Sequence, residues 1–174
     1  MRIVKKITDN KFLNLNEVQD VDNNVKGYQF AERLGRDSIA FICYDETTRE
    51  FLVNNEYKPP NDEFVAGAFG GSLDKDRAII EIVKDEVEEE AGFIVSMKED
   101  IKLVGRMFVS TQMNQYCYLY IVFVNRKNQG KKKPENAIEA MATTEWLDEK
   151  GIMSLNEWKA ITILAKAKSL RILG

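Results

Sequence analysis

Short apolar runs alternate with polar, turn-forming residues along most of the chain, a pattern that predicts β-strands. Within residues 1–30, apolar runs at Ile3–Ile7, Phe12–Leu15 and Val25–Phe30 are separated by clusters of Asn and Asp. Such clusters form turns, because their side chains hydrogen-bond the nearby backbone. We therefore expect an N-terminal appendage of short strands.

The next apolar runs predict a hairpin and three further strands. Ser38–Tyr44 and Glu50–Val53 flank the polar segment 45–49, and Pro59 and Pro60 end the second run. Two β-prone runs with a short polar connection indicate a β-hairpin. We expect the later strands at Ile101–Ser110, Tyr116–Val124 and Ala140–Leu147.

The period changes to that of a helix between Asp74 and Ala91. Apolar residues recur every fourth position at Ile79, Val83, Val87 and Ala91, with acidic and basic residues on the other face. We expect Asp74 or Asp76 to cap this helix and Gly92 to end it. A second amphipathic helix is expected over 155–173, and a loop with solvated lysines over 125–136.

Length and composition favour one globular unit. The chain has 174 residues, of which 44% are hydrophobic and 30% charged. This mixture is that of a folded domain in water, and the length suffices for one substantial core. Strands interspersed with helices in a continuous pattern predict an α+β protein. We divide it into residues 1–30 as the appendage and residues 31–174 as the main domain.

Charge and cysteine content narrow the partners and the compartment. The formal net charge of −3 gives no general attraction to nucleic acid or anionic lipid. Apolar stretches are interrupted by charge before the roughly 20 residues that a membrane span requires. We therefore expect neither a nucleic-acid nor a membrane partner. Cys43 and Cys117 lie in apolar runs, so we expect buried free thiols and a cytoplasmic location.

The chain contains no histidine, which removes several kinds of chemistry. Ser-His-Asp and Cys-His nucleophiles and His-ligated zinc are excluded. Any catalysis falls to carboxylates. On a helical wheel, Glu86 and Glu90 are about 40° apart at the edge of the apolar stripe, with Glu89 beside them. This arrangement fits either a solvated acidic face or a site for Mg²⁺, which prefers oxygen ligands.

The sequence around this helix resembles the Nudix hydrolases. The family box ends in Arg-Glu, an aliphatic residue, any residue, Glu-Glu, any residue and Gly, and residues 85–93 read Asp-Glu-Val-Glu-Glu-Glu-Ala-Gly-Phe. Segments 36–45, 51–60 and 64–67 resemble the ADP-ribose pyrophosphatase branch. The resemblance covers roughly residues 33–152. It implies an α/β/α sandwich with a mixed sheet.

The match departs from the family pattern at two charged positions. Counted back from Gly92, the box glycine is Gly71, which places Arg77 where the family has Glu and Asp85 where it has Arg. In an alternative alignment, Ala66 and Gly67 are the family's Ala-Gly and four extra residues lengthen the loop. We prefer this second alignment, in which the carbonyl of Ala66 is a metal ligand. Replacement of the bracing Arg by Asp85 suggests altered support of the glutamates.

The resemblance implies a magnesium-dependent hydrolase of nucleoside diphosphate derivatives, with Mn²⁺ as a possible substitute. Glu86, Glu89 and Glu90 would be the metal-binding and catalytic carboxylates. ADP-ribose is the first substrate to consider, while nucleotide sugars and dinucleotides remain open. The alternative is a nucleotide-binding or sensor protein with weak or no catalysis.

The resemblance also suggests a general base, substrate contacts and an oligomeric state. The base would come from the loop before the penultimate strand, as Glu135 or Glu139, with deprotonation by the metal and Glu89 as the remaining option. Arg36 and Lys58 stand where the branch uses cations near the phosphates. Members of the branch dimerise through N-terminal strands, which implies a homodimer.

Overall fold

The computed structural model describes residues 1–33, 35, 37–74 and 76–173. Arg36, which we expected to bind substrate, lies outside the described residues. The strands are β1 (Arg2–Lys6), β2 (Leu13–Asp20), β3 (Val25–Arg33), β4 (Ser38–Asp45), β5 (Glu50–Lys58), β6 (Glu63–Gly67), β7 (Phe69–Ser72), β8 (Ile101–Ser110), β9 (Met113–Phe123) and β10 (Thr143–Leu147). The α-helices are α1 (Ile79–Glu86), α2 (Ala137–Met141), α3 (Glu149–Met153) and α4 (Trp158–Ser169), with short helical turns η1 (Val87–Ala91), η2 (Lys98–Asp100) and η3 (Arg126–Asn128).

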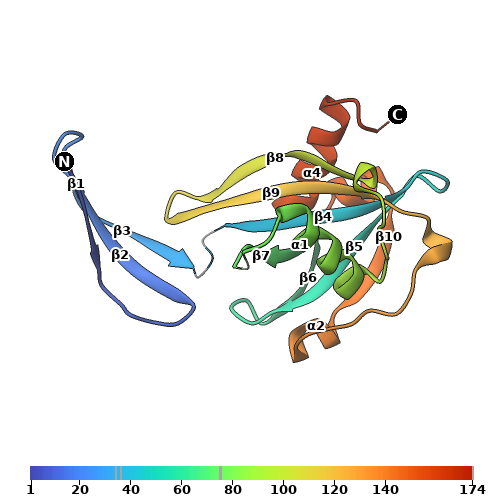
Figure 1. The fold of residues 1–174 in the computed structure, drawn as a ribbon, viewed down its shortest axis with the longest axis horizontal. Helices are drawn as coiled ribbons and strands as arrows, with labels where there is room; N and C mark the ends of the chain where they lie inside the picture. The colour runs from blue at the N-terminus through green and yellow to red at the C-terminus, as the bar shows by residue number, and fades with distance from the viewer. Residues whose placement is uncertain (34, 36, 75, 174) are drawn as a thin grey trace.

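The strands form one mixed sheet in the order β1-β2-β3-β9-β4-β5-β10, with β6 paired to β5, β7 to β4 and β8 to β9. At the centre, β4 and β9 run parallel over seven paired positions from Ser38–Cys117 to Tyr44–Phe123. The expected hairpin is present as β4 and β5, which pair antiparallel next to the turn. The sheet is curled, and β7 lies along β4 on the side of α1 (Figure 1).

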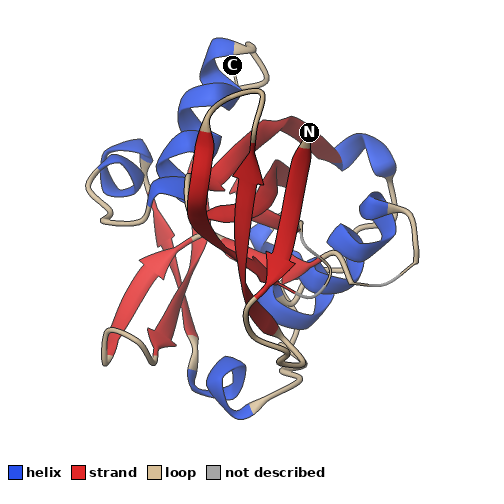
Figure 2. Ribbon diagram, turned by 90° about the vertical axis from the view of Figure 1, so that its left-hand side faces the viewer, coloured by secondary structure: helices blue, strands red, loops and turns tan. Residues whose placement is uncertain are grey.

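Helices cover both faces of the central strands, as expected of an α/β/α sandwich. Successive β4 side chains point to opposite faces, so Ile42 packs with α4 while Phe41 packs with α1. Both side chains are fully buried. Figure 2 shows helices on the two sides of the strands. Because β4 is buried on both faces, its continuous apolar run follows from its central place.

The first three strands form an arm that extends away from this body (Figure 1). The arm joins the main sheet through β3, which pairs with β9 at Ala31 and Met113. β1 is the outer strand of the arm and pairs only with β2 among the described strands. The expected N-terminal strands are therefore present.

Helix α1 starts later than we expected. Its N-cap is Ala78, with no side-chain hydrogen bond, so the proposed caps Asp74 and Asp76 are wrong. The segment before Ala78 does not enter the helix, and Asp74 lines a cavity instead. The helix continues into the π-helical turn η1 and ends at Gly92, whose φ of 77° is the left-handed conformation that glycine adopts without strain.

Two other boundaries also differ from expectation. Residues 140–141 are helical, because the Asn136 side chain accepts hydrogen bonds from the backbone N–H groups of Ile138 and Glu139 and starts α2. The closing helix starts only at Trp158, where the side chain of Glu157 caps it by accepting from the N–H of Ala160.

The cysteines agree with expectation, since Cys43 and Cys117 are both free and buried. None of the helices in the described part of the chain is long and apolar enough to cross a membrane.

Candidate active site

Five glutamates that we expected to act in catalysis line one cavity of about 350 Å³. Glu86 ends α1, and Glu89 and Glu90 belong to η1. Glu135 and Glu139 come from the segment that leads into α2. The other lining residues are Arg33, Gly70, Gly71, Ser72, Asp74 and Asn136. The fold therefore brings two groups of acidic residues, far apart in sequence, to one polar cavity.

The glycines of β7 allow the glutamates to approach the sheet. The N–H of Gly70 donates a hydrogen bond of 3.3 Å to Oε2 of Glu90. A Cβ at Gly71 would lie 2.3 Å from Oε1 of Glu86, so any larger residue there would displace the Glu86 carboxylate. The first of the two alignments, in which Gly71 is the box glycine, indicates a special role for this position.

Ala66 is not brought to this cavity. It lies on β6, opposite Asn55 of β5, and is absent from the residues that line the glutamate cavity. The neighbouring Gly67 packs against Glu157, whose Cγ would be 2.5 Å from an added Cβ. The backbone that lines the glutamate cavity beside β7 is that of Gly70 and Gly71.

Burial and a neighbouring negative charge perturb the carboxylate of Glu90. Glu90 is only 8% exposed to solvent. Burial first, and the negative charge of Glu86 second, raise the pKa of Glu90 to about 8, while the hydrogen bond from Gly70 opposes this rise. A cation in the cavity would relieve both effects.

The two residues that depart from the Nudix box contact each other. Nη1 of Arg77 lies 2.5 Å from Oδ2 of Asp85, in an ion pair that links the segment before α1 to the last turn of the helix. The two positions at which the sequence departs from the box thus carry opposite charges that pair with each other in this structure. The side chains are 45% and 40% exposed, so the pair contributes little to global stability.

The lysine-containing loop is bonded to the end of the glutamate helix, a feature that sequence reasoning missed. The N–H of Gly130 donates to the carbonyl of Gly92 at 2.7 Å, and the N–H of Lys133 donates to the carbonyl of Glu89 at 2.8 Å. The ammonium of Lys133 pairs with Glu88. Lys132, which we expected to be solvated, is half-buried and donates to the carbonyl of Ala142.

Glu135 and Glu139 differ in their hydrogen bonds. Oε2 of Glu139 accepts a hydrogen bond of 2.7 Å from the N–H of Glu135, and its Oε1 accepts from the side-chain amide of Asn136. The carboxylate of Glu139 is therefore held by the turn that starts α2. Glu135 is exposed, and its backbone rather than its carboxylate takes part in this turn.

A second cavity of about 350 Å³ adjoins the first and shares Arg33, Gly70, Gly71 and Ser72 with it. Lys58, which we expected to bind substrate, lines this second cavity, and its ammonium lies 2.7 Å from Oε2 of Glu56. Sequence reasoning missed the other lining residues with polar or long side chains, which are Arg33, Ser38, Glu56, Ser72, Met113, Gln115 and Lys159. An acidic cavity and a cation-lined cavity thus lie side by side.

The chemistry of the acidic cavity fits a hard divalent cation. Within the described ranges, no three carboxylates or thiols are already arranged as a metal site. The donors are nevertheless carboxylate oxygens and the backbone of β7, which suit Mg²⁺ or Mn²⁺ and not a softer ion. Oδ1 of the buried Asn54 has no hydrogen-bond partner in the described chain, and Asn54 lines a small space together with Glu90 and Lys132.

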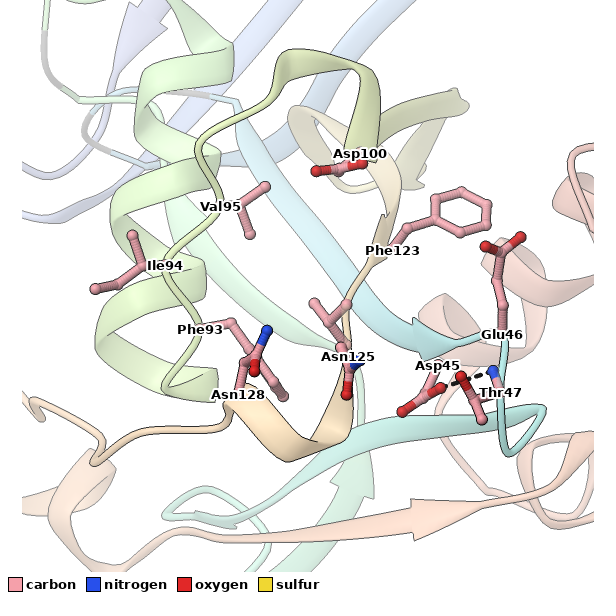
Figure 3. Close-up of a pocket in the computed structure, with 11 residues that line it drawn as sticks. Asp45, Glu46, Thr47, Phe93, Ile94, Val95, Asp100, Phe123, Asn125 and Asn128 are labelled. Carbon is pink, nitrogen blue, oxygen red and sulfur yellow. Dashed lines mark hydrogen bonds between the residues drawn. The ribbon is translucent and has the colours of Figure 1, made fainter.

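A larger cavity of about 380 Å³ lies away from these residues, between the loop after Gly92 and the β4–β5 turn (Figure 3). The carboxylate of Asp45 faces Thr47 and accepts its N–H at 2.7 Å. Burial opposes ionisation of Asp45, but hydrogen bonds from the N–H groups of Arg126 and Thr47 hold its pKa below the usual value. Asp45 therefore stabilises the turn, and this cavity contains none of the five glutamates.

Comparison with known proteins supports the fold. The chain is similar to a solved structure described as an ADP compounds hydrolase, with a TM-score of 0.77 and 13% sequence identity, over 97% of this chain and 91% of the other. No family model and no curated protein sequence matches the chain. The predicted α+β fold of the Nudix type is confirmed by this likeness, which at such low identity shows the fold alone.

Proposed function

We propose that the protein is a divalent-cation-dependent hydrolase that cleaves the diphosphate linkage of a nucleoside diphosphate derivative. The observation that carries the proposal is the cavity in which Glu86, Glu89 and Glu90 face Glu135 and Glu139. The similar solved structure is described as a hydrolase of ADP compounds, which makes ADP-ribose the first substrate to test. Other nucleotide sugars and dinucleotides follow.

Glu86, Glu89 and Glu90 would hold Mg²⁺, or Mn²⁺ in its place. Such an ion neutralises diphosphate charge and lowers the pKa of bound water. In place of Ala66, we propose the carbonyl of Gly70 as the backbone ligand. The N–H and C=O of one residue in an extended strand point to the same side, and the N–H of Gly70 already points to Glu90.

Glu135 would act as the general base. Its carboxylate would take the proton from a water molecule as the water oxygen bonds to phosphorus and the bridging P–O bond breaks. Glu139 is the second candidate, but its carboxylate is already held by the N–H of Glu135 and the amide of Asn136. We therefore assign Glu139 to positioning this turn and Glu135 to proton transfer.

Cations at the border of the two cavities would bind the phosphates. Arg33 lines both cavities, and Oγ of Ser72 accepts a hydrogen bond of 3.3 Å from its guanidinium. Lys58 lies in the second cavity with Glu56 beside it. Arg36 keeps its proposed role on the strength of the sequence alone.

We also propose a homodimer through the arm. Apolar side chains on the arm are exposed, among them Val4 at 51%, Phe12 at 64% and Val21 at 69%. An outer strand with unpaired backbone groups is a surface that a second copy can cover. The two free buried thiols suit a reducing cytoplasm.

The experiment is a product assay with a panel of nucleoside diphosphate derivatives in Mg²⁺ and in Mn²⁺. We expect nucleoside monophosphate and a sugar phosphate from the best substrate, and almost none from Glu90→Gln. Glu88→Gln is the matched control, because Glu88 pairs with Lys133 outside the cavity. Tight binding with no turnover in either metal would overturn the proposal in favour of a nucleotide-binding protein.

A further inference from the structure

Gln115 is a buried polar residue in the wall of the second cavity. It lies near the start of β9 and is 4% exposed. Side chains alternate along a strand, so Gln115 shares a face with Cys117 and Leu119, which are fully buried in the core on the side of α4. Gln115 thus stands where this core gives way to the cavity.

The amide of Gln115 has no hydrogen-bond partner in the part of the chain that the structure describes. Burying an amide unpaired costs about 1–3 kcal/mol, so a buried amide is normally satisfied. Asn54 Oδ1 is the one fully enclosed side-chain atom without a partner among the described residues. The amide atoms of Gln115 therefore keep access to the cavity that it lines.

The surroundings of Gln115 indicate which part of a substrate would reach it. Arg33 lies on the wall shared with the glutamate cavity, where the diphosphate would be held. Met113 and Val109 supply apolar surface beside the amide. A group placed here lies beyond the diphosphate, has an apolar face and presents hydrogen-bonding atoms at its edge.

We propose that Gln115 is a specificity-determining residue whose amide binds an adjacent donor and acceptor on the nucleoside part of the substrate. The proposal rests on the proposed function and names the substrate group that the second cavity selects. A side-chain amide presents one donor and one acceptor next to each other. Two parts of a nucleoside have the complementary pair, the edge of the base and the vicinal hydroxyls of the ribose.

The test is equilibrium binding by calorimetry without added metal, with ADP, IDP and ribose 5-phosphate as probes. Gln115→Met keeps the approximate size of the side chain and removes both hydrogen bonds. We expect it to weaken ADP binding by about 10- to 100-fold, as the loss of hydrogen bonds to buried groups predicts. Gln112→Met is the matched control, because Gln112 is exposed and outside the cavity.

The probes separate the two sources of the donor–acceptor pair. If Gln115 binds the base, the variant binds ADP and IDP more weakly, because the amide can turn to pair with either base edge, and it binds ribose 5-phosphate as the wild type does. If it binds the ribose, the variant loses affinity for ribose 5-phosphate as well.

A stability measurement separates recognition from a structural role. Because the amide has no partner within the described chain, Gln115→Met should leave the melting temperature of the ligand-free protein equal to or above that of the wild type, whereas a structural hydrogen bond would make the variant melt lower. Gln115→Glu, which removes the donor and adds a negative charge near the phosphates, should also weaken ADP binding. Wild-type affinity for every probe in both variants would overturn the proposal alone. Failure of the wild type to bind any probe, both without metal and with added Mg²⁺, would overturn the proposed function with it.

Discussion

Replacing Glu90 by Gln should make the metal-free protein more stable at alkaline pH. The pKa of Glu90 rises from 4.5 to about 8 because the side chain is buried and lies near the negative charge of Glu86. A folded-state pKa above the unfolded value means that the unfolded chain releases this proton first. Glu90 therefore costs nothing below pH 4.5, and its cost increases with pH until the folded protein also ionises near pH 8.

The size of the effect follows from the pKa difference. Each pKa unit corresponds to about 1.4 kcal/mol, so the full cost above pH 8 is at most about 5 kcal/mol. Glu90→Gln removes the charge while keeping the shape and the hydrogen bond from Gly70. We expect its gain in the free energy of unfolding to be near zero at pH 4 and several kcal/mol at pH 9.

The assay is urea unfolding in the presence of a chelator across this pH range, with Glu88→Gln as the control. Glu88 pairs with Lys133 at the surface, so its variant should follow the wild type. Added Mg²⁺ should make the wild type more stable to urea than Glu90→Gln at alkaline pH, because the metal stabilises only the protein that binds it. A Glu90→Gln variant whose stability parallels the wild type from pH 4 to pH 9 would refute the reasoning.

Three further predictions concern the remaining parts of the site and the arm. Glu135→Gln should lower turnover by about 10²- to 10⁴-fold with little change in substrate binding, while Glu139→Gln should lower turnover less. Single-turnover kinetics of both variants measure these losses, and a larger loss in Glu139→Gln would assign the role of base to Glu139. Asp85→Arg and Arg77→Glu should each weaken Mn²⁺ affinity by about 10-fold, as is usual for residues that hold metal ligands in place. The double variant restores the ion pair and should recover the affinity. No recovery in Mn²⁺ titrations would show that the ion pair does not support the glutamates. Val4→Lys on the arm should shift the mass in light scattering from dimer to monomer, and a wild-type monomer would contradict the dimer.

Much of the fold could be predicted because its elements have strong local patterns. The four-residue spacing from Ile79 to Ala91 gave the glutamate helix, and Gly92 marked its end. The two β-prone runs around residues 45–49 gave the hairpin. These features depend on side chains close together in the sequence.

The structure departs from the sequence expectations where distant residues decide the outcome. Two alignments of the glycines were possible from the sequence, and only the pairing of β7 with β4 places Gly70 and Gly71, not Ala66, against the glutamates. Likewise, Arg77 and Asp85 form an ion pair only because the segment before α1 folds back on the helix.

The second cavity could not be predicted for the same reason. Gln115 and Lys159 come from β9 and from α4 and meet only through the packing of the helix on the sheet. In the sequence, Gln115 follows the polar residues of a turn, and nothing in the local pattern indicates its burial.

The most direct test of the central claim is the hydrolysis of ADP-ribose with Mg²⁺ in water enriched in heavy oxygen, read by mass spectrometry. Attack at phosphorus predicts AMP and ribose 5-phosphate, with one heavy oxygen in the phosphate of one product. Glu90→Gln should give neither product, and Glu88→Gln should match the wild type. Intact ADP-ribose together with intact nucleotide sugars and dinucleotides in both Mg²⁺ and Mn²⁺, label in the sugar instead of a phosphate, or full turnover by Glu90→Gln would contradict the account.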